Sequence, residues 1–110
     1  MKIAVPAESN SLHSLTDDRF GRAKGFLVYD TETKTIVWID NEKNINAAQG
    51  AGLKAAQSII DSGAEALVTY DVGPKAFDLI QKSGIIIHRL ETKVKVKDAI
   101  LQAQNASEKK

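Results

Sequence analysis

The chain has 110 residues, of which 43% are hydrophobic and 26% are charged, so its length and composition predict a single compact domain over residues 1–110. Its 15 basic and 14 acidic side chains give a formal net charge of +1, which provides no overall field to draw it onto nucleic acid or an anionic membrane. The sequence has no cysteine, which excludes disulfides, thiol catalysis and thiolate-ligated zinc or iron–sulfur sites within this chain.

The first apolar run is Ile3 to Val5, and Pro6 closes it. This run predicts a short buried strand and is too short for the apolar part of a signal peptide. No other segment of the sequence reaches membrane-spanning length. We therefore expect a soluble cytoplasmic protein.

Residues 7–25 predict a long loop, because they contain serines, asparagine, aspartates and two glycines without sustained periodicity. Loops of this length are uncommon in small domains and are usually functional or mobile. The loop is therefore the first place to look for a site.

Two runs of β-branched and aromatic residues, 26–29 and 35–39, flank the polar segment 30–34. This pattern predicts an antiparallel hairpin. The second run has apolar side chains and stands at the end of the hairpin, so it is a candidate edge strand through which two copies could pair, with Trp38 contributing.

The rest of the chain alternates helical and extended patterns. The predicted elements are a helix over 48–60 stopped by Gly63, a strand over 66–70, a helix from Pro74 to Gly84, a strand over 85–87, a helix over 96–103 and a frayed tail over 104–110. Lysine and valine alternate over residues 93–97, and this pattern could instead mark the beginning of an edge strand. The boundary before the last helix stays open between these two interpretations.

The predicted order is three strands, then helix, strand, helix, strand and helix. Right-handed crossovers place such helices on both faces of a mostly parallel sheet, which makes this an α/β fold. The short apolar first strand is expected at the centre, with the hairpin on one side and the strands 66–70 and 85–88 on the other.

Ligands in such sheets bind beyond the carboxyl ends of the strands, where the connection order reverses direction. Here that point lies between the strands that end at Val5 and Tyr70. The long loop and two helix beginnings, 46–52 and 71–74, are expected to meet there. Two helix beginnings supply amide donors and positive dipole ends, so we expect a site for an anion.

Gly73 lets a ligand approach the backbone, although Gly73 and Pro74 also fit a simple tight turn that starts a helix. Gly50 and Gly52 are interpreted more readily as packing glycines than as ligand contacts. Asp71 either caps the following helix with its carboxylate, which we favour, or binds a cation.

The segment 19–24 holds three cations in six residues of the long loop. Its arginines, Arg19 and Arg22, offer planar donors for a phosphate, a carboxylate or an anionic metal cluster. The alternative is a set of solvated charges that Asp17 and Asp18 neutralise.

The two histidines, His13 and His88, lack a second histidine at metal-ligand spacing. His13, on the loop, is the better candidate for a metal ligand. An enzyme hypothesis combines Glu8 with Asp71 as carboxylate ligands of a divalent metal in a hydrolase. No nucleophile, phosphate-loop or zinc-protease motif supports catalysis, so we favour a non-enzyme.

Three stretches occur in order along the chain: FGRAKGFLVYD, QGAGLKAAQSIIDSGAEALVT and VGPKAFDLIQKSGIIIH. Together they resemble the dinitrogenase iron-molybdenum cofactor biosynthesis family of NifX-like and NifB C-terminal-like domains, from Lys2 to about Ala103. The resemblance implies a ribonuclease H-like, three-layer α/β/α fold with five strands in the order 3-2-1-4-5 and the second strand antiparallel.

The resemblance also implies a non-catalytic carrier or accessory protein for an anionic iron–sulfur or iron–molybdenum cluster, with cofactor-assembly proteins or metalloproteins as partners. Family members often carry histidine beside the Phe-Gly pair, where this chain has Arg19 and Arg22. A further alternative without a cofactor is an interaction domain that recognises a partner through its exposed loop. The candidate cofactor-binding residues are Arg19, Phe20, Gly21, Arg22, Gly50, Gly52, Asp71, Gly73 and Pro74, with His13 as the candidate metal ligand.

Overall fold

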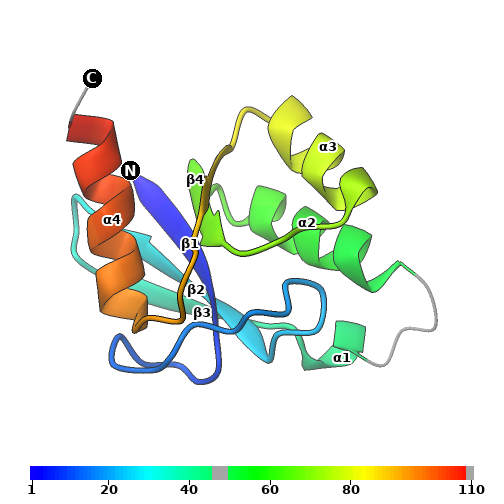
Figure 1. Ribbon diagram of the computed structural model, residues 1–110, viewed down its shortest axis with the longest axis horizontal. Coiled ribbons are helices and arrows are strands. Elements are labelled where there is room, and N and C mark those ends of the chain that lie inside the picture. The colour runs from blue at the N-terminus through cyan, green and yellow to red at the C-terminus, as the bar shows by residue number, and fades with distance from the viewer. Residues whose placement is uncertain (46–49, 109–110) are drawn as a thin grey trace.

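A computed structural model of the protein describes residues 1–45 and 50–108 (Figure 1). The strands are β1 Lys2–Ala7, β2 Gly25–Asp30, β3 Ile36–Asp40, β4 Ala66–Thr69 and β5 Ile86–Arg89. The helices are α1 Glu42–Ile45, α2 Ala51–Asp61, α3 Pro74–Lys82 and α4 Val96–Glu108.

The five strands form one mixed sheet in the order β3-β2-β1-β4-β5, which confirms the predicted order with β1 at the centre. β2 pairs antiparallel with both β1 and β3, whereas β4 pairs parallel with β1 and β5. The strands β1 and β4 are neighbours, but β1 is followed by β2 on one side of the sheet and β4 is followed by β5 on the other side. The carboxyl ends of β1 and β4 therefore mark the predicted switch point.

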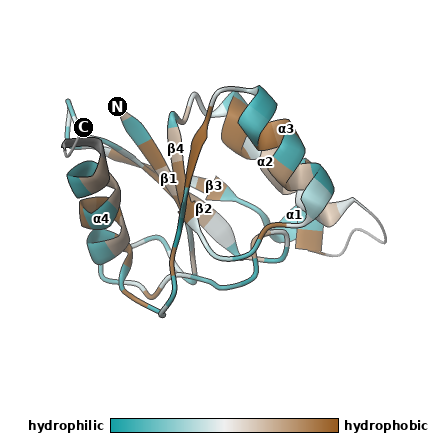
Figure 2. Cartoon of the chain, turned by 45° about the horizontal axis from the view of Figure 1, so that its top comes forward, coloured by the Kyte–Doolittle hydropathy of each residue, from teal (hydrophilic) through white to brown (hydrophobic). Residues whose placement is uncertain are grey.

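Helices cover both faces of the sheet, so the fold has three layers. On one face α2 and α3 bring Ile59 and Ile80 against Phe26 and Leu67. On the other face α4 packs Val96 and its neighbours against β1 and β4. Figure 2 shows bands of hydrophobic and hydrophilic residues alternating along α3 and α4, as expected for helices with one buried side.

Several boundaries differ from the sequence prediction. The first strand does not end at Val5, because β1 continues through Pro6 to Ala7, which pair with Phe26 and Gly25 of β2. α1, at Glu42–Ile45, lies in a polar segment to which the sequence assigned no element. α4 continues to Glu108, beyond the predicted helix over 96–103. The predicted helix over 48–60 begins at Ala48, which lies outside the described residues, and α2 is described from Ala51.

Both described ends of the chain lie at one end of the molecule. Met1 precedes β1, and α4 runs back along the sheet so that its last turn comes near Met1 (Figure 1). The beginnings of α2 and α3 lie at the other end, beside the loop that contains Phe20. Within the described ranges, no helix has the length and apolar character needed to cross a membrane.

Candidate functional site

A groove of about 730 Å³ lies where α2 and α3 begin. Three segments that are far apart in the sequence line it: the long loop at Phe20 and Gly21, the start of α2 over 50–53, and the segment 71–76 that enters α3. The structure thus brings most of the candidate residues together, namely Phe20, Gly21, Gly50, Gly52, Asp71, Gly73 and Pro74.

Both helices begin at the groove with a glycine at the N-cap position, which has no side chain to cap the first amides. The N-cap residue of α2 is Gly50, whose φ of 77° is in the left-handed region that glycine tolerates best. The N-cap residue of α3 is Gly73, and Pro74 occupies the first helical position. Since the first amides of a helix have no partner within it, two sets of N–H donors and two positive dipole ends border one groove.

The glycines of the groove have different roles. A β-carbon built on Gly21 would meet the Cα and amide nitrogen of Gly52, each at 3.0 Å, so the loop and α2 touch through their backbones. A β-carbon on Gly52 would lie 3.8 Å from that of Ala76 on α3. Nothing lies within 4 Å of a β-carbon built on Gly73. Gly21 and Gly52 therefore permit close packing, whereas Gly73 leaves open space.

A buried asparagine fixes the loop wall of the groove. The Nδ2 atom of Asn41 donates to the carbonyl oxygens of Ala23 at 2.8 Å and Gly21 at 3.2 Å. Its Oδ1 atom accepts from Nδ2 of Asn44 at 2.8 Å. Asn41 is fully buried. Our sequence analysis missed this residue, because a single asparagine after a strand carries no pattern.

Asp71 lies on the rim but does not cap α3, so our preferred interpretation of its carboxylate is wrong. Its Oδ1 atom accepts from Nε of Arg89 at 3.0 Å and pairs with Nη2 of Arg89 at 2.9 Å. The pair is solvent-exposed, with 87% of the Asp71 side chain and 61% of the Arg89 side chain accessible. An ion pair this exposed contributes little to stability but sets the charge at the rim.

The two arginines that we predicted to hold an anion point to partners outside the groove. The Arg19 guanidinium makes two hydrogen bonds to the buried carboxylate of Asp17, each at 3.1 Å, and these bonds raise the pKa of Arg19. Nη1 of Arg22 donates to the carbonyl oxygen of Ile45 at 2.5 Å. Neither side chain lines the groove. The cation that does line it is Lys75, which sequence reasoning overlooked although it follows Gly73 and Pro74 directly.

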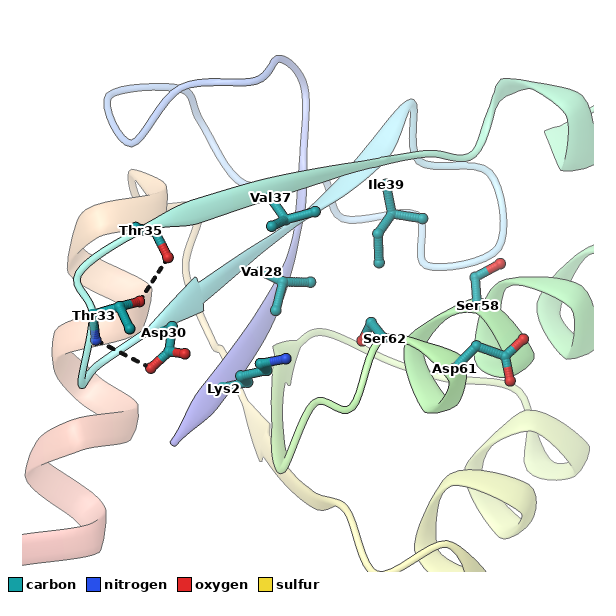
Figure 3. A pocket seen from close by; sticks show the side chains of 10 residues that line it. All are labelled: Lys2, Val28, Asp30, Thr33, Thr35, Val37, Ile39, Ser58, Asp61 and Ser62. Atoms are coloured by element: carbon teal, nitrogen blue, oxygen red, sulfur yellow. Dashed lines mark hydrogen bonds between the residues drawn. The ribbon is translucent and has the colours of Figure 1, made fainter.

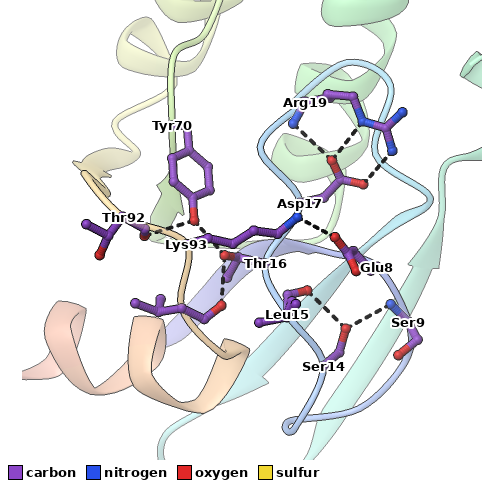
Figure 4. Close-up of polar contacts among 11 residues, drawn as sticks. Glu8, Ser9, Ser14, Leu15, Thr16, Asp17, Arg19, Tyr70, Thr92 and Lys93 are labelled. Atoms are coloured by element: carbon purple, nitrogen blue, oxygen red, sulfur yellow. Dashed lines mark hydrogen bonds and ion pairs between the residues drawn. The ribbon is translucent and has the colours of Figure 1, made fainter.

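The long loop is fastened to the rest of the fold, mostly on the α4 side (Figure 4). Oγ1 of Thr16 lies within hydrogen-bond distance of both the Tyr70 hydroxyl, at 2.7 Å, and the carbonyl oxygen of Val94, at 2.9 Å, and its one proton serves either of them. The Tyr70 hydroxyl donates to the carbonyl oxygen of Thr92 at 3.0 Å. Thr92 and Val94 lie in the segment before α4, and Tyr70 directly follows β4. These hydrogen bonds therefore connect the long loop to the end of β4 and to the segment that leads into α4.

His13 lies on this α4 side rather than at the groove. Its neighbours are bonded to the first turn of α4: the amides of Val96 and Lys97 donate to the carbonyl oxygens of Ser14 and Leu12 at 2.8 and 3.0 Å. The His13 side chain is exposed. The structure therefore does not bring His13 to the candidate cofactor-binding residues.

The carboxylates of the hydrolase hypothesis are both engaged by cations. Oε2 of Glu8 accepts from Nζ of Lys93 at 2.5 Å, and this hydrogen bond raises the pKa of Lys93 (Figure 4). Asp71 pairs with Arg89. In the part of the chain that the structure describes, no three histidine, cysteine, aspartate or glutamate side chains are grouped as metal ligands would be. No observation supports the hydrolase alternative.

Comparison with known proteins gives one matching family model, described as "Dinitrogenase iron-molybdenum cofactor", over residues 1–106. Among curated proteins, the uncharacterized protein MJ0580 of Methanocaldococcus jannaschii is 30% identical over 95 residues, which cover 84% of this chain and 76% of that protein.

Two solved structures are similar in both sequence and fold. The apo form of the orange protein from Desulfovibrio gigas is 42% identical with a TM-score of 0.89, covering 96% of this chain and 88% of that one. A putative NifB protein from Thermotoga, solved by NMR, is 34% identical with a TM-score of 0.80, covering 94% of this chain and 87% of that one.

Proposed function

The chain belongs to the dinitrogenase iron-molybdenum cofactor family, and from this membership we propose that it is a non-catalytic accessory protein that binds an anionic metal cofactor. The cofactor would be an iron–sulfur or iron–molybdenum type cluster. Its partners would be the proteins that assemble the cofactor or receive it. The proposed binding surface is the groove between the beginnings of α2 and α3.

One observation carries this proposal: two helices begin at the same groove, and the N-cap residue of each is a glycine, which has no side chain to cap the first amides. Uncapped helix beginnings are ready-made sites for negative charge. Because the sequence has no thiolate, we propose that the groove holds the whole anion by hydrogen bonds from amides rather than by ligating its metal ions. Such binding is reversible, which suits a protein that hands its cargo on.

The charged side chains at the rim of the groove also support an anionic ligand. Lys75 lines the groove and adds a positive charge beside the first amides of α3. The negative charge of Asp71 opposes an anion, but Arg89 binds that carboxylate and offsets it. We also keep Arg19 and Arg22 as proposed ligand-binding residues. To contact the ligand, Arg19 would have to leave Asp17, and Arg22 would have to leave the carbonyl oxygen of Ile45.

The direct test replaces Gly73 by aspartate. A carboxylate at this N-cap position satisfies the free amides of α3 and places negative charge in the groove, and there is space for it. Gly73→Asn is the matched control, since it offers the same cap without the charge. The apo chain would be incubated with iron and sulfide, with and without molybdate, desalted and examined by visible absorption.

We expect a stable absorption band with the wild-type chain, its loss in Gly73→Asp, and an intermediate band in Gly73→Asn. Lys75→Gln should weaken the band without affecting the fold, because the side chain is exposed. A wild-type chain that stays colourless, or a Gly73→Asp variant that retains the full band, would show that this groove does not hold such a cofactor.

A further inference from the structure

The outer strand β3 leaves an apolar edge open to solvent. It is the last strand of the sheet on its side, and Val37 and Ile36 have exposed fractions of 61% and 39%. Protected edge strands usually carry charges or proline along their length. The sequence from Thr35 to Ile39 carries neither.

The backbone of β3 offers unpaired groups at defined positions. The bonds from Asp30 N to Thr35 O and from Asn41 N to Lys24 O cross between the hairpin strands at 3.0 and 2.9 Å. In an antiparallel pair, such bonded positions alternate with positions whose N–H and C=O groups point the other way. Ile36 and Trp38 therefore present their amide and carbonyl groups to the open edge.

A hollow of about 690 Å³ adjoins the same strand. Figure 3 shows Val28, Val37 and Ile39 pointing from β2 and β3 toward the space that faces the end of α2. The helices α2 and α3 pack mainly over β1, β2 and β4, and Val37 of β3 stays 61% exposed. The edge and the adjoining face of β3 are thus exposed together.

We propose that β3 pairs antiparallel with β3 of a second copy of this chain, so that the two sheets become continuous. With Val37 opposite Val37 of the second copy, Ile36 faces Trp38 and Thr35 faces Ile39 across the pair. The outward groups of Ile36 and Trp38 in both copies then make about four backbone hydrogen bonds.

Charge complementarity favours this register and a second copy as the occupant. The same alignment brings Lys34 of each copy opposite Asp40 of the other, so opposite charges close the pair at both ends. Moving the centre to Trp38 would instead set Ile36 against Asp40 and bring Lys34 opposite Glu42, which lies in α1 beyond the end of β3. The proposal is independent of the cofactor-binding role, since the groove lies elsewhere on the fold.

The test measures the mass of the full chain by sedimentation equilibrium over a range of concentrations. Trp38 is the one tryptophan, so its fluorescence emission should shift to shorter wavelength as pairing buries it. Val37→Lys places two lysines face to face at the centre and should weaken the dimer at least about tenfold. Ile86→Lys, on the opposite edge strand β5 with an exposed fraction of 45%, is the matched control and should leave the dimer intact.

A charge exchange tests the register. Lys34→Glu and Asp40→Lys should each weaken the dimer, and the double variant should restore it. The proposal is wrong if the wild-type chain stays monomeric up to about 1 mM. It is equally wrong if the dimer survives Val37→Lys, if Ile86→Lys abolishes it, or if the double charge variant fails to recover pairing.

Discussion

Gly21 lies so close to Gly52 that a β-carbon on Gly21 would stand 3.0 Å from the Cα atom of Gly52. The Gly21→Ala variant must therefore move the loop away from the start of α2, and overpacking of this kind costs about 1–3 kcal/mol of unfolding free energy. Urea denaturation measures this loss. Gly73→Ala is the control for added bulk, because a β-carbon there has no neighbour within 4 Å, and it should cost less than Gly21→Ala although alanine is a poorer N-cap residue than glycine. Equal stability of Gly21→Ala and wild type would contradict the contact.

Removing the side chain of Asn41 should loosen the same wall of the groove. The Asn41→Ala variant leaves the buried carbonyl groups of Gly21 and Ala23 without their donor, which costs about 1–3 kcal/mol. Thermal unfolding measures the loss, with Asn10→Ala on the exposed loop as the control. If both variants unfold at the wild-type temperature, the asparagine does not support the loop.

The Tyr70 hydroxyl connects the long loop to the segment before α4. Tyr70→Phe removes its hydrogen bonds to Thr16 and to the Thr92 carbonyl, at a cost of about 0.5–1.5 kcal/mol. Hydrogen exchange should accelerate at the amide of Thr16, which donates to the Val94 carbonyl. Tyr29→Phe on β2 serves as the control. Unchanged exchange at Thr16 in Tyr70→Phe would show that the loop is held by its other bonds.

Asp30 should make the hairpin sensitive to acid. Its carboxylate accepts backbone hydrogen bonds from Glu32 and Thr33, and the bond from Glu32 is the main reason that the pKa of Asp30 falls below its ordinary 3.8. A carboxylate with a lowered pKa stabilises the fold above 3.8 and loses this contribution as the pH falls through the lower folded value.

The expected result is a stability difference between wild type and Asp30→Asn that is constant from neutral pH to about pH 5 and shrinks below that range. Asparagine keeps an acceptor oxygen, so the comparison isolates the charge. Denaturation series at several pH values measure the difference, with the exposed Glu91→Gln as the control. A difference that grows on acidification would reverse the predicted sign.

The sheet was predictable from the sequence because its strands are short runs of apolar residues separated by turn residues, and because handedness limits how such units connect. Helix ends were harder to predict. The single turn Glu42–Ile45 has too few residues to show a period, and α4 extends past Ala103 through polar residues that have no apolar repeat. The ribonuclease H-like classification stays a prediction.

Gly73 was predictable because it stands between β4 and α3 at the switch point of the sheet. The arginines were not, because the direction of an arginine depends on the local path of its loop. Arg19 turns to a carboxylate two residues away, and Arg22 turns to a carbonyl group on another segment. Lys75 would have been found by extending the Gly73-Pro74 motif one residue further.

The position of the two chain ends has a practical consequence for engineering. Since Met1 and the last turn of α4 lie together and away from the groove, a fluorescent protein or an affinity tag can be fused there without blocking it (Figure 1). The amino-terminal ammonium donates to Oγ1 of Thr31 at 3.1 Å, which a fusion at that end would remove. The carboxyl-terminal side of α4 is therefore the better attachment point for a reporter.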